Sequence, residues 1–559
     1  MIYMNKTYIT TERDDMKLYF IGADREVTGS CHVIEVNGKH IMLDCGMEQG
    51  RDVYVNEDLP VPAGEIDAVL LSHAHIDHSG LLPKLVKDGF HGTIWCTDAT
   101  KQLCEIMLKD SAHIQESEAE WASRKAKRSG RKQVKPMYTV KDAEIAMLYF
   151  QSVQYGQEFS PVEGVTARYE DGGHILGSAV IYLTLQEDGK TRTLAYTGDL
   201  GNINMPIVND PSPRETTDYV ITESTYGDRL HDKVDNPVKQ LADIMNRTFA
   251  RGGNVVIPAF AVGRTQEILY FIREILENDL VSFKDFDVFV DSPLAEEATA
   301  IFEENTFGYY DEEAMKILRE GGHPLVFPNL RLVIDVEESK LINTITKPSV
   351  IISASGMCTS GRIKHHLKHN LWRPECTIAF AGYQAEDTLG RRLVDGEKDV
   401  RIFQEDIHVE AEIVELQDVS AHADRDGLVH WLTDNPEKPK SVFVVHGEDS
   451  VAEQFAKYLQ NSYGYEASAP YSGYVFDLLY NKYLSTEEPD RVLSAEEKKE
   501  EIRQDQEREQ DTYSQNKYYS ELMEKGKKLI RLIEKRKDAK NSELKKFLKE
   551  VSKLVSRWD

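Results

Sequence analysis

The sequence has few cysteines and no long hydrophobic runs. Its six cysteines include no C-x-x-C pair, so neither a disulfide framework nor a thiolate zinc site is indicated, and we expect reduced, structural thiols. No stretch approaches the roughly 20 apolar residues that a membrane-spanning helix needs. Residues 1–15 also lack the apolar core of a secretion signal. We therefore expect a cytosolic protein that does not cross a membrane.

Positive charge is outweighed by negative charge. Lysine and arginine together number 67 against 95 acidic residues, which gives a formal net charge of −28. Indiscriminate coating of nucleic acid needs a basic surface, so that class of function is disfavoured and any contact with RNA must be local. A chain of 559 residues is too long to fold around one ordinary hydrophobic core, and we expect about three or four domains.

Short strand-like and helical stretches alternate along most of the chain. From about residue 16 to 200, and again from about 225 to 404, apolar runs end in loops rich in Gly, Pro or Ser, as in "NVVIPAF" and "SVIISASGM". This pattern is typical of α/β proteins, whose functional residues lie on strand-end loops. Two further strand–loop–helix units follow, up to about residue 485.

The tail beyond about Ser485 changes character. It is rich in Glu, Lys and Arg, being largely acidic over residues 487–509 and lysine-rich over residues 525–557. In the last part of the tail, six apolar residues fall on one side of the expected helix. They are Leu544, Phe547, Leu548, Val551, Leu554 and Val555. Such helices dock on the body of the chain, on a second copy to form a homodimer, or on another protein, and RNA binding is the less favoured alternative.

Metal-binding side chains cluster in the segment "LLSHAHIDHSG", directly after the strand-like run "IDAVLLS". They are His73, His75, Asp77 and His78. His174, in "DGGHILGSA", and Asp199, at the end of "LAYTGD", share this strand-end context. A single residue of this kind is more often structural, but together they indicate a metal site. Imidazole and carboxylate ligands suit zinc, and this number of ligands suits two ions.

The metal string resembles that of the metallo-β-lactamase superfamily, and Asp44 in "IMLDCGM" resembles its first motif. The resemblance implies two zinc ions, one held by His73, His75 and His174. The other would be held by Asp77 and His78, with Asp199 bridging the two ions. Asp44 would orient the ligands, because a ligating imidazole usually needs its other nitrogen hydrogen-bonded.

The second half narrows the resemblance to the β-CASP nucleases, in the branch of the endonuclease subunit of the cleavage and polyadenylation specificity factor. From about Lys17 to Leu479 the matching pieces include "TESTYGDR", "IPAFAVGRTQEIL", "DSPLA", "SASGMCTSGRIKHHL", "GYQAEDTLGR", "VSAHADRDGL" and "VVHGE". The resemblance implies an α/β fold, in which a metallo-β-lactamase αββα sandwich carries an inserted α/β β-CASP domain. The implied segments are 1–227 and 406–485 for the sandwich, 228–405 for the insert and 486–559 for a helical extension.

This branch adds three functional residues. By resemblance, His446 completes the second zinc site, while His422 protonates the leaving 3′ oxygen and Glu223 partners it. The catalytic candidates are Asp77, Glu223 and His422. Zinc would lower the pKa of a shared water and neutralise the phosphate during in-line attack. This polarity of cleavage would leave a 5′-phosphate and a 3′-hydroxyl.

Two cleft loops are candidate phosphate contacts. In "SASGM" and "AVGRTQE", backbone N–H groups and a guanidinium would reach phosphates through Ser355, Gly356 and Arg264. A plain strand-to-helix turn explains these segments equally well. "GYQAEDTLGR" has Asp387 where relatives usually carry Gly, a departure that affects local loop geometry. The pattern also starts without the RNA-binding KH modules of archaeal relatives, so substrate capture falls to the cleft or the tail.

Several other residues resemble functional groups but are discounted. His365 and His369 have the i, i+4 spacing of a helical zinc pair, but no Glu follows the first, so we expect them on a helix surface. Tyr518 and Tyr519 lack a surrounding basic strand pattern, and packing is favoured over base stacking. His231 receives no role.

We therefore expect a zinc-dependent ribonuclease that acts on single-stranded RNA in RNA processing or decay, as an endonuclease, a 5′-to-3′ exonuclease or both. One alternative is a hydrolase of a small ester or thioester, but such enzymes lack the long insert. Another is a catalytically silent scaffold, but every ligand position is filled here. DNA is a further candidate substrate within the β-CASP group.

Overall fold

A computed structural model describes residues 16–49, 54–128, 132–231, 236–385, 387–416, 420–492, 517–537 and 539–557. The chain divides into two compact units, Met1–Asp490 and Arg491–Asp559. All six cysteines are buried and free, which confirms the expected thiols. No helix in the described ranges combines the length and apolar character needed to cross a bilayer. The expectation about a secretion signal concerns residues 1–15, which lie outside these ranges.

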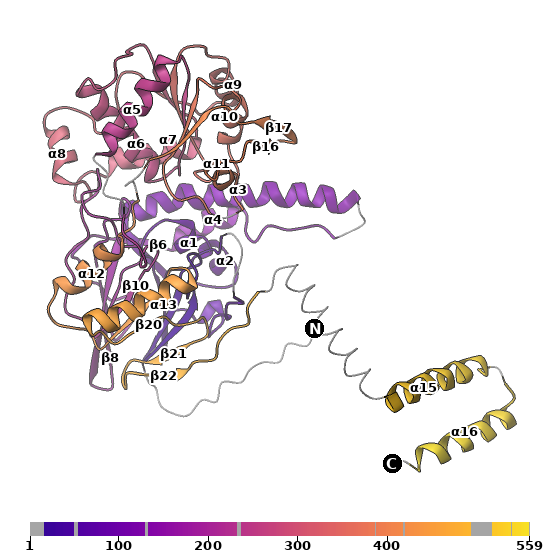
Figure 1. Ribbon diagram of the computed structural model, residues 1–559. Coiled ribbons are helices and arrows are strands. Elements are labelled where there is room, and N and C mark those ends of the chain that lie inside the picture. The colour runs from indigo at the N-terminus through magenta and orange to yellow at the C-terminus, as the bar shows by residue number, and fades with distance from the viewer. Residues whose placement is uncertain are drawn as a thin grey trace. The chain divides into compact units, whose positions relative to one another are not determined.

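Two β-sheets form the centre of the first unit (Figure 1). The eight-stranded sheet has the order β22-β21-β1-β2-β3-β4-β5-β6. Its strands are β1 (Lys17–Gly22), β2 (Cys31–Val36), β3 (Lys39–Leu43), β4 (Ala68–Leu70), β5 (Thr93–Thr97), β6 (Phe150–Val153), β21 (Val475–Asp477) and β22 (Lys482–Ser485). The six-stranded sheet has the order β20-β19-β10-β9-β8-β7. Its strands are β7 (Val165–Asp171), β8 (Ala179–Glu187), β9 (Lys190–Tyr196), β10 (Tyr219–Thr222), β19 (Ser441–Val444) and β20 (Ala467–Ser468).

Alternation along the strands explains how these sheets are layered. In β8, Ile181 and Leu183 point into the core between the two sheets, whereas Val180 and Tyr182 pack under the helices on the other face. Those helices are α12 (Arg425–Asp434) and α13 (Asp449–Tyr458). The opposite outer layer consists of α1 (Ile76–Ser79), α2 (Leu82–Lys87), α3 (Asp98–Arg128) and α4 (Val140–Ala146). The αββα sandwich expected from the sequence is thereby confirmed.

The insert contains a third sheet, in which all strands are parallel, with the order β13-β12-β14-β11-β15-β18. Its strands are β11 (Val255–Pro258), β12 (Asp287–Val290), β13 (Leu330–Leu332), β14 (Ser349–Ser353), β15 (Thr377–Phe380) and β18 (Glu412–Glu415). Val255 and Ile257 face one helical layer and Val256 faces the other, as buried parallel strands require. These layers contain α5 (Pro237–Ala250), α6 (Arg264–Glu277), α7 (Pro293–Glu304), α8 (Glu312–Arg319), α9 (Val336–Ile342), α10 (Ile363–Asn370) and α11 (Leu389–Val394).

The insert extends further along the chain than residue 405, where the sequence placed its end. The β16–β17 hairpin (Asp399–Ile402 and Glu405–His408) leads directly into β18, which pairs with β15 along its whole length. With no Pro or Gly at this point, local turn signals do not reveal that the chain enters one more strand of the same sheet. The other segment boundaries inside the first unit stay predictions.

Insert and sandwich share one continuous core, which fixes the two halves against each other. The amide groups of Gln102 on α3 and Asn305 after α7 exchange two hydrogen bonds, of 3.4 and 2.9 Å. A Cβ on Gly263 would lie 3.2 Å from Ile175, the neighbour of His174. The loop that starts α6 therefore packs directly against the loop that carries a proposed metal ligand.

The second unit contains the helices expected in the tail, α15 (Lys517–Lys535) and α16 (Asn541–Val555). None of its described residues is buried. Leu544, Phe547 and Val551 are half-buried, whereas Leu548 and Leu554 are exposed. A pair of helices that buries so little apolar surface needs a further surface to pack against. Most of the acidic segment before α15 lies outside the described residues.

Candidate metal centre and active site

The residues that the sequence selected converge at one edge of the six-stranded sheet. β8 runs antiparallel to both β7 and β9, and β10 and β19 run parallel to β9. The carboxyl ends of β7, β9, β10 and β19 therefore meet, and each is followed within three residues by a candidate. The four candidates are His174, Asp199, Glu223 and His446. From the facing sheet, the loop after β4 adds His73 and His75, and α1 adds Asp77 and His78.

Three histidines surround one oxygen of Asp199. His75 Nδ1 lies 3.1 Å from His73 Nε2 and 3.2 Å from His174 Nε2. The Nε2 atoms of His73 and His174 lie 3.4 and 3.5 Å from Asp199 Oδ2. Burial lowers the pKa of His73 and of His174 well below the ordinary histidine value, so these imidazoles are neutral, as metal ligation requires.

A second group faces the other oxygen of Asp199. His78 Nε2 lies 3.1 Å from Asp199 Oδ1, and His446 Nε2 lies 3.6 Å from it. His446 Nε2 also lies 3.5 Å from Asp77 Oδ2. In each of the two groups, one potential ligand atom per residue lies within 4.8 Å of every other. Asp199 therefore stands between the two groups, with one carboxylate oxygen turned to each.

These side chains fit metal cations. Within the described part of the chain, the buried atoms Asp199 Oδ1 and His446 Nε2 form no well-aligned hydrogen bond. Buried polar atoms normally have partners, so such orphaned atoms facing one another need a further group to satisfy them. A cation attracts lone pairs from all of these atoms at once, and the imidazole and carboxylate set is the one that zinc prefers.

Asp44 is the centre of a buried hydrogen-bond network beside His78. Its carboxylate accepts hydrogen bonds from the Ser72 backbone N–H at 2.6 Å, the Ser72 hydroxyl at 2.7 Å and the Tyr196 hydroxyl at 2.7 Å. His78 Nδ1 donates to the same carboxylate at 2.7 Å. This contact leaves His78 Nε2 as the nitrogen that faces Asp199, which is how a partner on one imidazole nitrogen prepares the other for a metal.

His422 forms a pair with Glu223 at the edge of the metal group. His422 Nδ1 donates to the Glu223 carboxylate, with distances of 3.2 and 3.1 Å to its two oxygens. Glu223 is fully buried and also accepts the Leu200 backbone N–H at 2.6 Å. Burial alone would lower the pKa of His422, but the Glu223 carboxylate, together with the charges of Asp199 and Asp77, raises that pKa to about 9. The His422 side chain is 23% exposed, so it is open to a substrate while its Nδ1 is engaged.

His231, which received no role from the sequence, supports His422 from behind. Its Nε2 lies 2.9 Å from the His422 carbonyl oxygen, to which it donates, and its backbone N–H donates to the Asp424 carboxylate at 3.0 Å. The ring of Tyr226 packs edge-on against His231. No motif or spacing in the sequence signals this contact, because the acceptor is a backbone carbonyl 191 positions away.

Among the described residues, none of the three predicted phosphate contacts forms a hydrogen bond or ion pair with a metal-ligand candidate. The Arg264 guanidinium is largely buried and ion-paired with Glu267. Gly356 lies beside the half-exposed ring of Phe260, in the loop that precedes α6, where a Cβ on the glycine would come within 3.0 Å of the ring. Ser355 lies next to it with its hydroxyl 3.3 Å from Thr359 Oγ1. Their roles in binding phosphate stay predictions.

Two further sequence-based interpretations are settled by α10 and the loop before α11. His365 and His369 are exposed on α10, as expected. The sequence missed His366 between them, which is buried with its Nε2 2.6 Å from Asp291 Oδ2.

Asp387 has a φ of 63°, a left-handed conformation that Gly adopts freely and Asp tolerates better than most residues. The loop geometry at Asp387 is therefore one that a glycine would also adopt.

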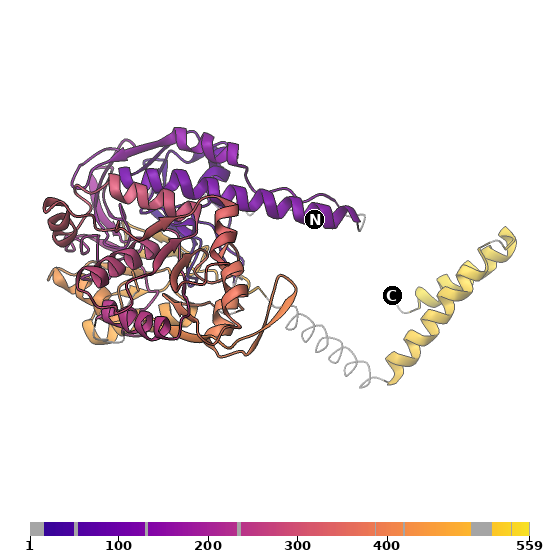
Figure 2. The same ribbon diagram turned by 90° about the horizontal axis from the view of Figure 1, so that it is seen from above.

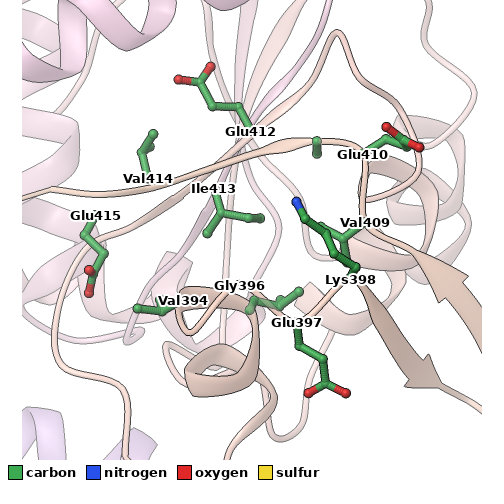
Figure 3. Close-up of a pocket in the computed structure, with 12 residues that line it drawn as sticks. Val394, Gly396, Glu397, Lys398, Val409, Glu410, Glu412, Ile413, Val414 and Glu415 are labelled. Carbon is green, nitrogen blue, oxygen red and sulfur yellow. The ribbon is translucent and has the colours of Figure 1, made fainter.

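The cavity shown in Figure 3 lies away from this chemistry. It has a volume of about 460 Å³ and is lined by residues between 393 and 415, at the end of α11 and along β18. Ile413 points into it from β18. It contains none of the metal-ligand candidates, and Glu412 on its rim is already ion-paired with Arg247 and Arg251.

Three family models match the chain in succession. They are the metallo-β-lactamase superfamily over residues 24–226, the Beta-Casp domain over 265–393 and the Zn-dependent metallo-hydrolase RNA specificity domain over 406–470. Ribonuclease TTHA0252 of Thermus thermophilus is 35% identical over 438 residues, which are 78% of this chain and 94% of that protein. The chain belongs to the β-CASP metallo-β-lactamase family. It is a zinc-dependent, RNA-specific hydrolase of that family, with the fold that its motifs predicted.

Two archaeal relatives of this β-CASP enzyme come from Methanocaldococcus jannaschii. Transcription termination factor FttA is 30% identical over 457 residues, covering 79% of this chain and 68% of its own length. An RNase J-like protein is 30% identical over 444 residues, covering 78% of this chain and 94% of its own length. These relatives differ in their named activities, so they leave the mode of cleavage open.

Proposed function

We propose that this enzyme cleaves RNA phosphodiester bonds with two zinc ions, one held by His73, His75 and His174 and the other by Asp77, His78 and His446, with Asp199 bridging them. The observation that carries the proposal is the position of Asp199, whose two carboxylate oxygens face two separate groups of ligands. Zinc bound there supplies Lewis-acid chemistry, neutralising phosphate charge and acidifying water.

The protein's own residues orient the reacting groups. Asp44 presents His78 to the second group through the Nδ1 hydrogen bond. His446 Nδ1 lies 3.1 Å from the Thr225 hydroxyl, and His174 Nδ1 lies 3.4 Å from the Ala421 carbonyl oxygen, to which it donates. Each contact occupies the nitrogen that is not needed for the metal, so the ligand nitrogens are fixed before a metal arrives.

His422 is proposed to donate the proton to the leaving 3′ oxygen. Glu223 engages its Nδ1 and favours the protonated ring, so Nε2–H is the donor that remains available to substrate. Protonating an alkoxide as it departs is ordinary general acid catalysis. His231 holds the His422 backbone and thereby the ring's position. Cleavage of the bond between the phosphorus and this 3′ oxygen leaves a 5′-phosphate and a 3′-hydroxyl.

The C-terminal unit is proposed to serve association and to take no part in the chemistry. All of the residues named above precede Asp490, and the apolar side chains of α15 and α16 are largely exposed. Helices of this kind bury their apolar stripe against a second copy of the chain or another protein.

Product mapping tests this function and the mode of cleavage. The purified enzyme is incubated with 5′-end-labelled single-stranded RNA and with DNA of the same sequence, with and without a chelator. We expect RNA cleavage that the chelator abolishes and zinc restores. Internal fragments at early times indicate endonuclease activity, whereas release of single 5′ nucleotides indicates the exonuclease mode. Chelator-resistant cleavage, or hydrolysis of DNA but not RNA, contradicts the proposal.

A further inference from the structure

One surface of this acidic protein is strongly basic. Residues 121–135 contain seven lysines and arginines and no acidic residue. Six of these cations lie in the described part of the chain, and all six are exposed. They are Arg124, Lys125, Lys127, Arg128, Lys132 and Lys135. We call residues 121–128 and 132–135 the arm tip.

The arm tip is carried by α3, which starts beside the metal centre. At its beginning, the hydroxyls of Thr97 and Thr100 donate to the Gly177 carbonyl, in the loop of His174, at 2.7 and 2.8 Å. The helix has 31 residues, which at 1.5 Å per residue makes it about 46 Å long. Beyond Ala112 its only buried residues are Ala119 and Ala126. Figures 1 and 2 both show its second half projecting beyond the sheets.

The cations of the arm tip are held together by a structural link. The Ser123 hydroxyl donates to the Val134 carbonyl at 3.0 Å and accepts the Val134 N–H at 2.9 Å. This pair of bonds fastens the returning segment to the last turns of α3. Lys132 and Lys135 on the returning segment are thereby held beside the cations of the helix.

The arm tip also presents an exposed aromatic ring. Trp121 is 66% exposed, and Lys125 Nζ lies 5.3 Å from the centre of its ring. Cations at a helix C-terminus interact favourably with the helix dipole, but that effect ends within the last turn and explains neither the lysines beyond α3 nor an exposed tryptophan. Positive charge beside an aromatic face is the combination that binds single-stranded nucleic acid, through phosphates and base stacking.

We propose that the arm tip is a binding site for single-stranded RNA, which captures long substrates at a distance from the metal centre. This inference rests on the proposed function for the identity of the nucleic acid. Because the first unit is otherwise rich in acidic residues, a polyanion that approaches it is drawn to this local basic site. An RNA that spans the arm gains these contacts, whereas a short oligonucleotide in the active site does not reach them.

The test neutralises the arm tip in the full-length, zinc-loaded protein. The variant carries Arg124→Gln, Lys127→Gln, Arg128→Gln, Lys132→Gln and Lys135→Gln. A matched control removes the same charge from exposed lysines elsewhere, as Lys190→Gln, Lys284→Gln, Lys316→Gln, Lys340→Gln and Lys482→Gln. Fluorescence anisotropy measures binding of RNAs of about 8 and about 50 nucleotides, a range that brackets the usual site sizes. His422→Ala is added to each protein so that the RNA stays intact.

We expect the neutralised variant to bind the long RNA at least about tenfold more weakly, with the slope of log Kd against log salt reduced by about 0.7 for each lost phosphate contact. Its affinity for the short RNA and the affinities of the control variant should change less than about twofold. Trp121→Ala should weaken long-RNA binding several-fold, and Trp121→Phe should restore most of it, since a phenyl ring still stacks.

Three results overturn the inference. One is equal affinity and salt slope in the neutralised and control variants, with Trp121→Ala also unchanged. Another is equal weakening for short and long RNA. The third is loss of poly-glutamate binding without loss of RNA binding, which would assign the arm tip to an acidic protein partner. Binding is measured without cleavage, so an enzyme that binds long RNA through the arm tip but cuts no RNA contradicts the proposed function alone.

Discussion

The proposed two-ion arrangement depends on Asp199. Its oxygens face different groups of histidines, and no other described residue stands between both groups in this way. Replacing it removes a ligand from each ion at once, so we expect Asp199→Ala to lose RNA cleavage and much of its zinc. Elemental analysis beside a cleavage assay measures both. Full activity in Asp199→Ala would contradict the two-ion mechanism.

The ring centres of His422 and His446 lie 6.3 Å apart, but the two side chains contact different groups, and their variants should fail differently. His446 faces both Asp77 and Asp199, so His446→Ala should lower zinc content and turnover together. His422 contacts Glu223 instead, so His422→Ala should keep its zinc and bind RNA nearly normally. Its chemical step should slow by about 100- to 10,000-fold, as expected for loss of a general acid.

Single-turnover cleavage and metal analysis of both variants separate these roles. Glu223→Gln serves as the milder comparison, since it keeps the shape of the carboxylate but not its charge. It should resemble His422→Ala in retaining zinc, with a smaller loss of rate. The opposite pattern, in which His422→Ala loses zinc and His446→Ala retains it, would reverse the two assignments.

At the scale of elements, a buried polar network ties α10 to β12. The Asp291 carboxylate, just after β12, accepts hydrogen bonds from His366 at 2.6 Å, Arg362 at 2.7 Å and Ser339 at 2.6 Å. Burial alone would raise the pKa of Asp291, but these three donors hold it below the ordinary value. Arg362 also donates to the Val333 carbonyl oxygen, so the network joins α9, α10 and the strand end.

Breaking this network should destabilise the insert in a pH-dependent way. Asp291→Asn removes the charge that three donors satisfy, and we expect it to cost about 3 kcal/mol of unfolding free energy at pH 7. Because the folded pKa is depressed, the carboxylate's contribution is present above the unfolded pKa and is lost as pH falls through the folded one. The difference between wild type and variant, measured by urea unfolding, should therefore shrink in acid.

The exposed His369 on the same helix provides the control. His369→Gln leaves the network intact, so its unfolding free energy should stay within about 0.5 kcal/mol of wild type at every pH. A cost for Asp291→Asn that is the same at neutral and acidic pH would show that lost packing, and not the charge, explains the effect.

At the scale of the whole molecule, the two units should divide catalysis from association. All proposed catalytic residues lie before Asp490, so a chain ending at residue 490 should cleave a short RNA at a rate within about twofold of the full chain, since no group acting in the transition state is lost. It should lose self-association or partner binding, because the exposed stripe of α16 is gone. Single-turnover cleavage and sedimentation compare the two chains.

The control for truncation is a full-length chain with Leu548→Ser and Leu554→Ser, which keeps the length and charge of the tail but weakens its apolar stripe. It should match the truncated chain in association and the wild type in cleavage. Loss of metal-dependent cleavage in a truncated protein that is still folded would refute this division.

The sequence by itself determined the fold family and indicated the seven ligand candidates, and its family resemblance suggested the pairing of Glu223 with His422; the roles of these residues stay predictions. It did so because ligands in this fold follow strand ends, where apolar runs and Gly turns mark their positions locally. Four of them also share one short loop. Only the tertiary structure showed the support of His422 by His231, the burial of His366 against Asp291, the continuation of the insert into β18 and the projection of α3. Each of these depends on packing between segments far apart in the chain, and side-chain periodicity reports only the face that a residue occupies, not the group that it meets there.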